Sequence, residues 1–406
     1  MTNPSRKAGP VQAIMLLMPS TLSTMGIVVL LPVLPMLMEH FKDVPNADYW
    51  VPMILTTPAL CLVVGSPIAG YVADLIGRRR LLMVAMAIYA VMGILPLFLD
   101  GLFAILASRV GVGIVEAAVL TVSTTLIGDF FKGHERDRWL GYQTAVASLS
   151  AVVLIFIGGL LGTFGWRGPF AVYASSLILL VGIWKLTWEP EPDASAGEKL
   201  GVVSWNGFPF LRIAGICVVT FFASVLFYTV QVELSLALAE KGVTDPAQSG
   251  ALQALASIGV PVGTIVFQWL SRFNNVRACL TAAFLLMGAG FVGIGRAPDA
   301  QMIVVAATVT TLGAGIVLPT LLTWAVRGLS FDQRGRGIGV WQGVFSVGQF
   351  FMPVLTTLLS RQLGGLFPAL VAIGTASLAA GLLAAVAWLT MGRGVANGGG
   401  PASLHL

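Results

Sequence analysis

Residues 50–80, WVPMILTTPALCLVVGSPIAGYVADLIGRRR, join a long uncharged stretch to a run of three arginines. A helix needs roughly 20 apolar residues to cross the hydrocarbon core of a bilayer. Arginines directly after such a stretch hold that end of the helix on the cytoplasmic side. The segment therefore predicts a membrane-spanning helix that ends in a cytoplasmic loop.

The same kind of apolar stretch recurs along all 406 residues. The chain is 57% hydrophobic and 10% charged, with a mean hydropathy of +0.89, whereas about a quarter of the residues of a soluble protein are charged. This excludes a water-soluble enzyme or a nucleic-acid-binding domain and predicts an all-α polytopic membrane protein of 12 transmembrane helices. The predicted spans lie near 11–38, 50–72, 80–99, 102–127, 139–162, 168–187, 208–236, 247–270, 278–296, 301–325, 337–360 and 366–391.

The basic residues predict the orientation. With both termini in the cytoplasm, 17 of the 23 Lys and Arg residues lie on the cytoplasmic side, five lie outside and Arg109 lies within a span. This asymmetry obeys the positive-inside rule. The basic residues are thus topology anchors, and no nucleic-acid partner is expected. The short loops favour a bacterial cytoplasmic (inner) membrane.

A midline linker divides the chain into two halves. The longest interior connection, WEPEPDASAGEKLGVVSWNG, is acidic and rich in small residues. Repeated halves with six spans each are typical of secondary transporters, in which two bundles move about a central site. We predict an N-terminal six-helix bundle at 1–187, a cytoplasmic linker at 188–207, and a C-terminal bundle at 208–406 with a short disordered tail from about 393.

Polar side chains form stripes on three predicted spans of the second half. Each stripe follows one helical face. Such stripes either form hydrogen bonds between helices or line a hydrated cavity, and their presence on three separate spans favours a central cavity. The candidate cavity residues are Thr220, Ser224, Tyr228, Gln231, Gln253, Ser257, Gln342, Ser346 and Gln349.

Charged residues within predicted spans form a second set of candidates. Arg109 and Glu116 lie seven residues apart on span 4 and so share a face, with about 10 Å of rise between them. Desolvation favours a neutral Glu116 and a nearby cation favours a charged one, so this residue could carry a proton. The alternative is a structural role that fixes span 4 against span 1 or 5. Glu233, near the outer end of span 7, is a possible outer-end site.

The loop Gly70–Arg80, GYVADLIGRRR, resembles the signature G-x-x-x-D-x-x-G-R-[RK]-[RK] of the major facilitator superfamily. The resemblance implies two six-helix bundles and a cytoplasmic latch that closes when the cavity faces outward. The alternative is that this loop only anchors the topology. The partners of Asp74 would be the Gly337 end of span 11 and Arg136 or Arg138. The implied latch residues are Gly70, Asp74, Gly77, Arg78 and Arg138.

Span 4, RVGVGIVEA from Arg109 to Ala117, resembles the Arg-containing motif of proton-coupled drug antiporters. The chain is therefore similar to the 12-span drug/proton antiporter-like (arabinose-efflux-permease-like) group. It departs from the span 5 motif G-x-x-x-G-P-x-x-G-G of that group. Gly158 and Gly159 are kept, but Ser150, Leu154 and Ile155 replace the first Gly and the Gly-Pro, so no proline kink is expected there.

Taken together, these features predict a secondary transporter that moves a small organic solute by alternating access. Proton-coupled efflux is favoured; a proton symporter or uniporter that imports a nutrient is the alternative, and a non-transporting receptor or scaffold is a weaker one. No enzyme activity, cofactor or metal is expected, since the driving force would be the proton gradient. Cys61, Cys217 and Cys279 are interpreted as packing residues. The expected partners are the solute and the lipid bilayer, and the expected state is a monomer without an obligate protein partner.

Overall fold

The computed structural model is all-helical, and twelve of its helices or helix groups are long and apolar enough to cross a membrane, which confirms the predicted fold class. It describes residues 8–190, 209–271, 275–327, 329 and 331–396. The helices are α1 Pro10–Leu17, α2 Pro19–Val28, η1 Leu31–Val33, α3 Leu34–His40, α4 Ala47–Ile76, α5 Arg78–Ile94, η2 Leu95–Leu97, α6 Leu102–Phe130, α7 Gly133–Gly162, η3 Gly168–Ala174, α8 Ser175–Leu186, α9 Phe210–Glu240, α10 Pro246–Ser257, α11 Gly259–Leu270, α12 Val276–Arg296, α13 Ala300–Val326, α14 Phe331–Leu363 and α15 Leu366–Ala396.

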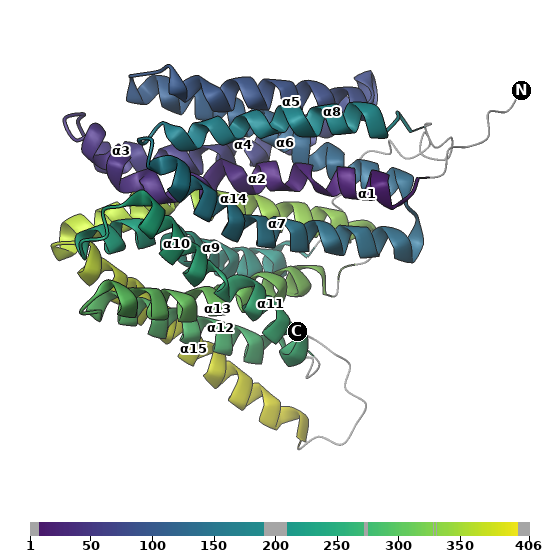
Figure 1. Ribbon diagram of the computed structural model, residues 1–406. Coiled ribbons are helices and arrows are strands. Elements are labelled where there is room, and N and C mark those ends of the chain that lie inside the picture. Colours follow the sequence, from purple (N-terminus) through teal and green to yellow (C-terminus); the bar gives the residue numbers. More distant parts are fainter. Residues whose placement is uncertain (1–7, 191–208, 272–274, 328, 330, 397–406) are drawn as a thin grey trace, which may run out of the picture.

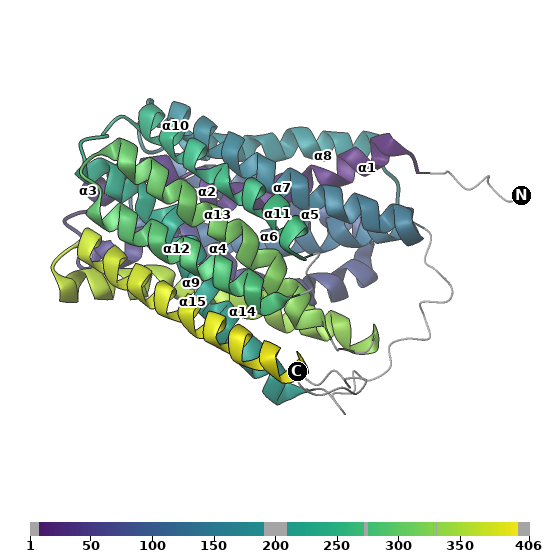
Figure 2. The ribbon, with the colours of Figure 1, turned by 90° about the horizontal axis from the view of Figure 1, so that it is seen from below.

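The helices gather into two bodies that follow the order of the chain (Figures 1 and 2). Helices α1–α8 form one body, here called the N-half, and α9–α15 form the other, the C-half. Most of the predicted linker lies outside the described residues, as does most of the predicted tail. Helix α15 itself continues to Ala396, beyond the predicted start of that tail.

Two prolines explain where single spans break. A proline ring clashes with the carbonyl four residues earlier and supplies no N–H donor. Pro32 stands four residues after Val28, where α2 ends and the chain passes through the short η1 turn. Pro261 stands four residues after Ser257, where α10 ends before α11 begins. Spans 1 and 8 are thus each built from more than one helix.

The two halves meet at the end of the molecule that carries Asp48, called the Asp48 end. Arg361 of α14 binds Asp48 of α4 through two nearly parallel hydrogen bonds of 2.8 and 2.7 Å. Thr357 donates a further bond of 3.1 Å to the Asp48 carbonyl. Beside them, Gly159 of α7 packs so closely on α10 that a Cβ on it would lie 2.9 Å from the Cα of Gly250. This end is therefore closed.

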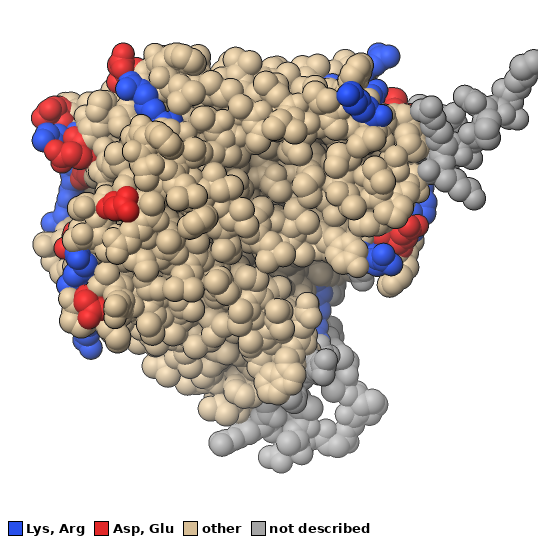
Figure 3. Space-filling model, viewed as in Figure 1, with Lys and Arg blue, Asp and Glu red and all other residues tan. Residues whose placement is uncertain are grey.

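The opposite end, called the Arg78 end, is open between the halves. Helices α4 and α14 are in contact at Asp48, which bonds to Thr357 and Arg361, and at Val63, which lies beside Gly343 near the middle of both helices. Beyond that point one face of α4 is more than half exposed, at Val64, Ile68, Tyr71 and Leu75. Figure 3 shows the charged side chains gathered toward the two ends, with a broad uncharged belt between them.

Candidate functional site

Helix α6 carries the two charged residues that the sequence placed inside the membrane. Arg109 is fully buried and Glu116 is 2% exposed. Small residues let neighbouring helices approach α6 at this level, since a Cβ on Gly113 would lie 2.6 Å from the Cα of Pro58 in α4. Both side chains are turned toward the first span, and within the described residues they form no ion pair with each other.

Arg109 ties three spans of the N-half together. Its Nη2 donates a hydrogen bond of 3.0 Å to the Gly26 carbonyl of α2 and another to the Tyr173 hydroxyl of η3. Its guanidinium also lies 4.9 Å from the centroid of the Tyr173 ring, an arrangement that allows a cation–π interaction. Nε and Nη1 have no hydrogen-bond partner among the described residues. These contacts favour a structural role for Arg109 inside the N-half.

Glu116 uses only one of its two carboxylate oxygens. Its Oε1 accepts a hydrogen bond of 2.9 Å from the Ser23 hydroxyl, whereas its Oε2 is buried with no partner in the described part of the chain. Gly26 makes the space for this oxygen, since a Cβ there would come within 2.8 Å of Oε2. The contacts of Glu116 thus lie within the N-half, against α2.

The residues of the polar stripes in the C-half differ in burial and in hydrogen bonding. Two of them form side-chain hydrogen bonds. The Ser224 hydroxyl donates to the Phe345 carbonyl of α14, and the Gln253 amide donates a bond of 2.9 Å to the Ser249 hydroxyl in its own helix. Tyr228 is half-buried and lies 5.7 Å from the Phe345 ring. The other stripe residues are buried (Thr220, Ser257, Ser346, Gln349), half-buried (Gln231) or exposed (Gln342).

Unpaired polar atoms mark the same stripes. Gln253 Oε1, Gln349 Nε2 and Thr220 Oγ1 are buried without a hydrogen-bond partner in the described residues. A polar group buried without a partner costs free energy. The C-half stripes thus combine interhelical hydrogen bonds with polar groups that can still receive a ligand or water.

Comparisons with known proteins now bear on these features. The sequence profile described as Major Facilitator Superfamily matches residues 16–272 and 215–401. The chain belongs to the major facilitator superfamily. It is therefore a membrane transporter of small molecules and not an enzyme, and its lipid environment follows from its twelve spans.

Two bacterial relatives, one of them named as an exporter, resemble this chain over most of its length. The bacillibactin exporter of Bacillus subtilis (strain 168) is 25% identical over 358 residues, which cover 83% of this chain and 87% of the exporter. The class D tetracycline resistance protein of Salmonella ordonez is 24% identical over 356 residues, which cover 86% and 90%. These relatives confirm the predicted likeness to drug/proton antiporters, and with the twelve spans they support a multi-pass protein of the bacterial inner membrane.

Solved superfamily structures share the fold. A bacterial homologue of the human lysosomal transporter Spinster, in an inward-facing and unoccupied conformation, superimposes with a TM-score of 0.77 at 18% identity, over 94% of this chain and 98% of that one. At this level of identity the match establishes the architecture of two six-helix bundles.

The superfamily signature loop lies at the open Arg78 end. Gly77 has φ +98°, a conformation that glycine adopts readily, so it makes the predicted tight turn. Arg78 pairs with Asp129 at the end of α6 and, at 3.3 Å, with Asp74. The Asp74 side chain is 66% exposed.

The predicted partners of Asp74 lie elsewhere in this conformation. Arg136 pairs with Asp137, Arg138 lies over the rings of Trp139 and Tyr142, and a Cβ on Gly337 would meet Leu329. Gly70 has open space where a Cβ would be. Asp74 thus pairs with Arg78 of its own loop and not with the predicted partners, as is expected of a superfamily member whose signature-loop end is open.

Several contacts of the site have no signature in the sequence. Ser23, Tyr173 and Asp129 were not singled out, although each binds a charged residue discussed above. Asp129 could have been found, since it is an acidic residue at the end of an apolar run and has basic neighbours. Ser23 and Tyr173 belong to ordinary apolar stretches.

Proposed function

We propose that this protein exports a small amphipathic organic solute by alternating access, driven by proton entry. The proposed orientation places the Arg78 end in the cytoplasm, in accord with the distribution of basic residues, so the open end would receive solute from inside. The proposed transport unit is the monomer. The exporter among the relatives supports the direction.

The observation that carries the coupling proposal is the half-satisfied carboxylate of Glu116. A membrane-buried acid is a costly feature and commonly marks an ion pathway. Its free Oε2 can take up a proton without displacing Ser23, which remains bonded to Oε1. In the proposed cycle the charged acid holds the form that accepts solute, and protonation removes that charge so that the empty carrier can return.

Transport by purified protein in proteoliposomes tests this proposal. Tetracycline and bacillibactin, the compounds named for the two relatives, are the first probes, and an imposed pH gradient supplies the driving force. We expect Glu116→Gln to abolish gradient-driven accumulation while exchange of solute across the membrane continues. Ser108→Ala is the control, because the Ser108 hydroxyl bonds only within its own helix, to the Ile105 carbonyl. Undiminished accumulation by Glu116→Gln would refute the coupling role.

The direction of flux distinguishes export from import. Helix α7 runs unbroken from Gly133 to Gly162 and contains no proline, so the proline kink of the span 5 antiporter motif is missing. This feature favours the alternative, a symporter or uniporter for a nutrient. Solute movement in the direction opposite to proton flow supports export, and solute movement in the same direction as proton flow supports import.

A further inference from the structure

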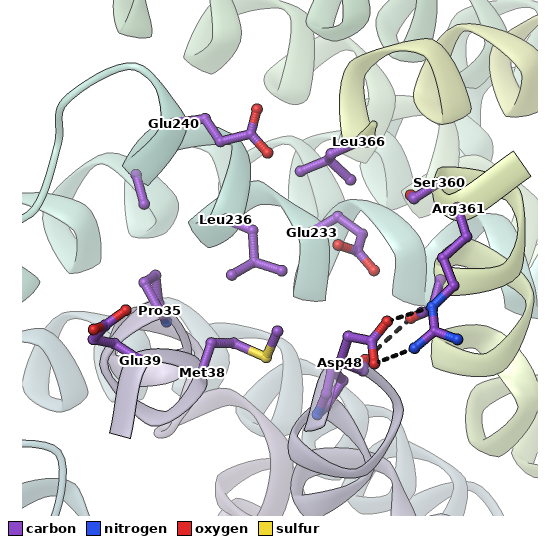
Figure 4. A pocket seen from close by; sticks show the side chains of 13 residues that line it. Pro35, Met38, Glu39, Asp48, Glu233, Leu236, Glu240, Ser360, Arg361 and Leu366 are labelled. Carbon is purple, nitrogen blue, oxygen red and sulfur yellow. Dashed lines mark hydrogen bonds and ion pairs between the residues drawn. The ribbon is translucent and has the colours of Figure 1, made fainter. Parts of the chain in front are cut away.

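A cavity of about 600 Å³ lies between the halves at the closed Asp48 end (Figure 4). It is separate from Glu116, which does not line it. The N-half contributes residues of α3 and α4, and the C-half contributes residues of α9, α14 and α15. We call this space the vestibule, and its lining residues are Pro35, Met38, Glu39, Asp48, Pro52, Glu233, Leu236, Ala239, Glu240, Thr357, Ser360, Arg361 and Leu366.

Negative charge outweighs positive charge around the vestibule. Its lining holds four carboxylates and one guanidinium. Arg361 is already paired with Asp48, and Glu39 is paired with Lys42. The two carboxylates of α9, Glu233 and Glu240, form no ion pair among the described residues, although Lys241 directly follows Glu240.

Glu233 is the unusual member of this set because it is 95% buried. Its Oε1 accepts a hydrogen bond of 2.7 Å from Thr356, and its second oxygen has no partner in the described part of the chain. Glu240, a second carboxylate of α9, lines the same vestibule. In Figure 4 the Glu233 carboxylate points into the vestibule, toward the side that carries Asp48. A buried carboxylate without a counter-ion is costly, and a cation in the vestibule would relieve that cost.

The walls of the vestibule suit an organic cation better than a metal ion. Pro35, Met38, Leu236 and Leu366 supply apolar surface around the carboxylate. A volume of this size is in the range of pockets that hold small organic ligands. Sites for such ligands combine apolar walls with a few polar groups that fix the orientation.

We propose that the vestibule is a second binding site, which takes a lipophilic organic cation with its charged centre at Glu233. This site goes beyond the proposed function and does not depend on Glu116 or on proton coupling. Because its lining comes from both halves, a bound cation joins α9 to α3 and α4 and favours the conformation in which the Asp48 end is closed.

Equilibrium binding of radiolabelled tetraphenylphosphonium to the full chain in phosphatidylcholine nanodiscs tests the proposal. We expect saturable binding of this cation. Tetraphenylborate, an anion of the same shape, should show no binding that depends on Glu233. Glu233→Gln should weaken binding of the cation about tenfold or more, because the ion pair is lost in a largely desolvated site. Glu135→Gln is the matched control, since Glu135 is an exposed carboxylate at the start of α7.

A second variant separates a binding defect from a folding defect. Met38→Trp fills the vestibule from α3 without changing its charge, and it should also weaken binding of tetraphenylphosphonium. The proposal is overturned if wild-type protein shows no saturable binding, if Glu233→Gln binds as tightly as wild type, or if tetraphenylborate competes as well as the cation.

Discussion

The two buried charged side chains of α6 have different kinds of hydrogen-bond partner, although they belong to the same helix. Arg109 bonds to neutral oxygen atoms of the N-half and stacks beside an aromatic ring. Glu116 has one hydroxyl donor and one free oxygen. A guanidinium keeps its proton at any ordinary pH, whereas a carboxylate with a free oxygen can exchange one. This difference is why the coupling proposal rests on Glu116 alone.

The hydrogen bond between Arg109 and Tyr173 supports a prediction about stability. Tyr173→Phe keeps the ring beside the guanidinium but removes the hydroxyl acceptor from a buried cation. We expect the free energy of unfolding to fall by about 1.5–3 kcal/mol, the range for hydrogen bonds to charged groups. Reversible denaturation of the purified protein in detergent micelles measures the change.

Tyr89 provides the matched control for this measurement. It is fully buried, its ring lies 5.3 Å from that of Tyr173, and its hydroxyl donates to the Leu22 carbonyl. Tyr89→Phe removes a bond between neutral groups, which contributes about 1 kcal/mol. If Tyr173→Phe costs no more than Tyr89→Phe, the Arg109 bond does not stabilise the N-half.

The sequence predicted where the charged residues lie but not what they touch. Spacing along a helix places Arg109 and Glu116 on one face, and both are buried as their position in an apolar run indicates. Their partners come from α2 and η3, far away in the chain, and depend on how the helices are rotated against each other. No periodic pattern carries that information, so Ser23 and Tyr173 had to be found in the structure.

At the scale of elements, the prolines inside the spans differ in their effects. Pro32 and Pro261 stand four residues after helix ends. Pro52, Pro58 and Pro67 lie inside the unbroken helix α4. The ring always removes one hydrogen bond, but packing decides whether the helix ends there. This decision belongs to the tertiary structure, which explains why the spans were predictable and their internal breaks were not.

The contact between α7 and α10 supports a prediction about conformation. Gly159→Val would drive side-chain atoms into the Gly250 backbone and the Pro246 carbonyl. The closed Asp48 end should therefore separate. Spin labels at the exposed positions Thr163 and Gln248, one on each half, should show a longer distance in this variant by pulsed electron paramagnetic resonance.

Gly141→Ala is the control for that experiment, because it lies in the same helix and a Cβ on it has nothing within 4 Å. It should leave the distance between the labels unchanged. An unchanged distance in Gly159→Val as well would mean that the helices do not need the glycine contact to close this end.

At the scale of the whole molecule, the two ends hold opposing ion contacts. The Asp48 end is closed by a pair between α4 and α14, and Arg361 also lies 4.5 Å from the ring centroid of Tyr49. At the Arg78 end, Asp74 is exposed and pairs with Arg78 of its own loop, so that a partner from the C-half can reach it only when that end closes. Alternating access requires that each set of contacts stabilises one form, so that breaking either set shifts the population in a known direction.

Arg361→Gln and Asp74→Asn should therefore have opposite effects. The first loses a partly exposed ion pair, which contributes about 0.5–1 kcal/mol, so the form with a closed Asp48 end should become roughly two- to fivefold less populated. The second weakens the latch of the other form and should make the present form more populated. Labelling of a single cysteine at Gln231, in a cysteine-free background and from each side of the membrane, measures both shifts. If both variants changed the labelling in the same direction, these contacts could not belong to opposite forms, and the assignment of the two ends to a single alternating cycle would be wrong.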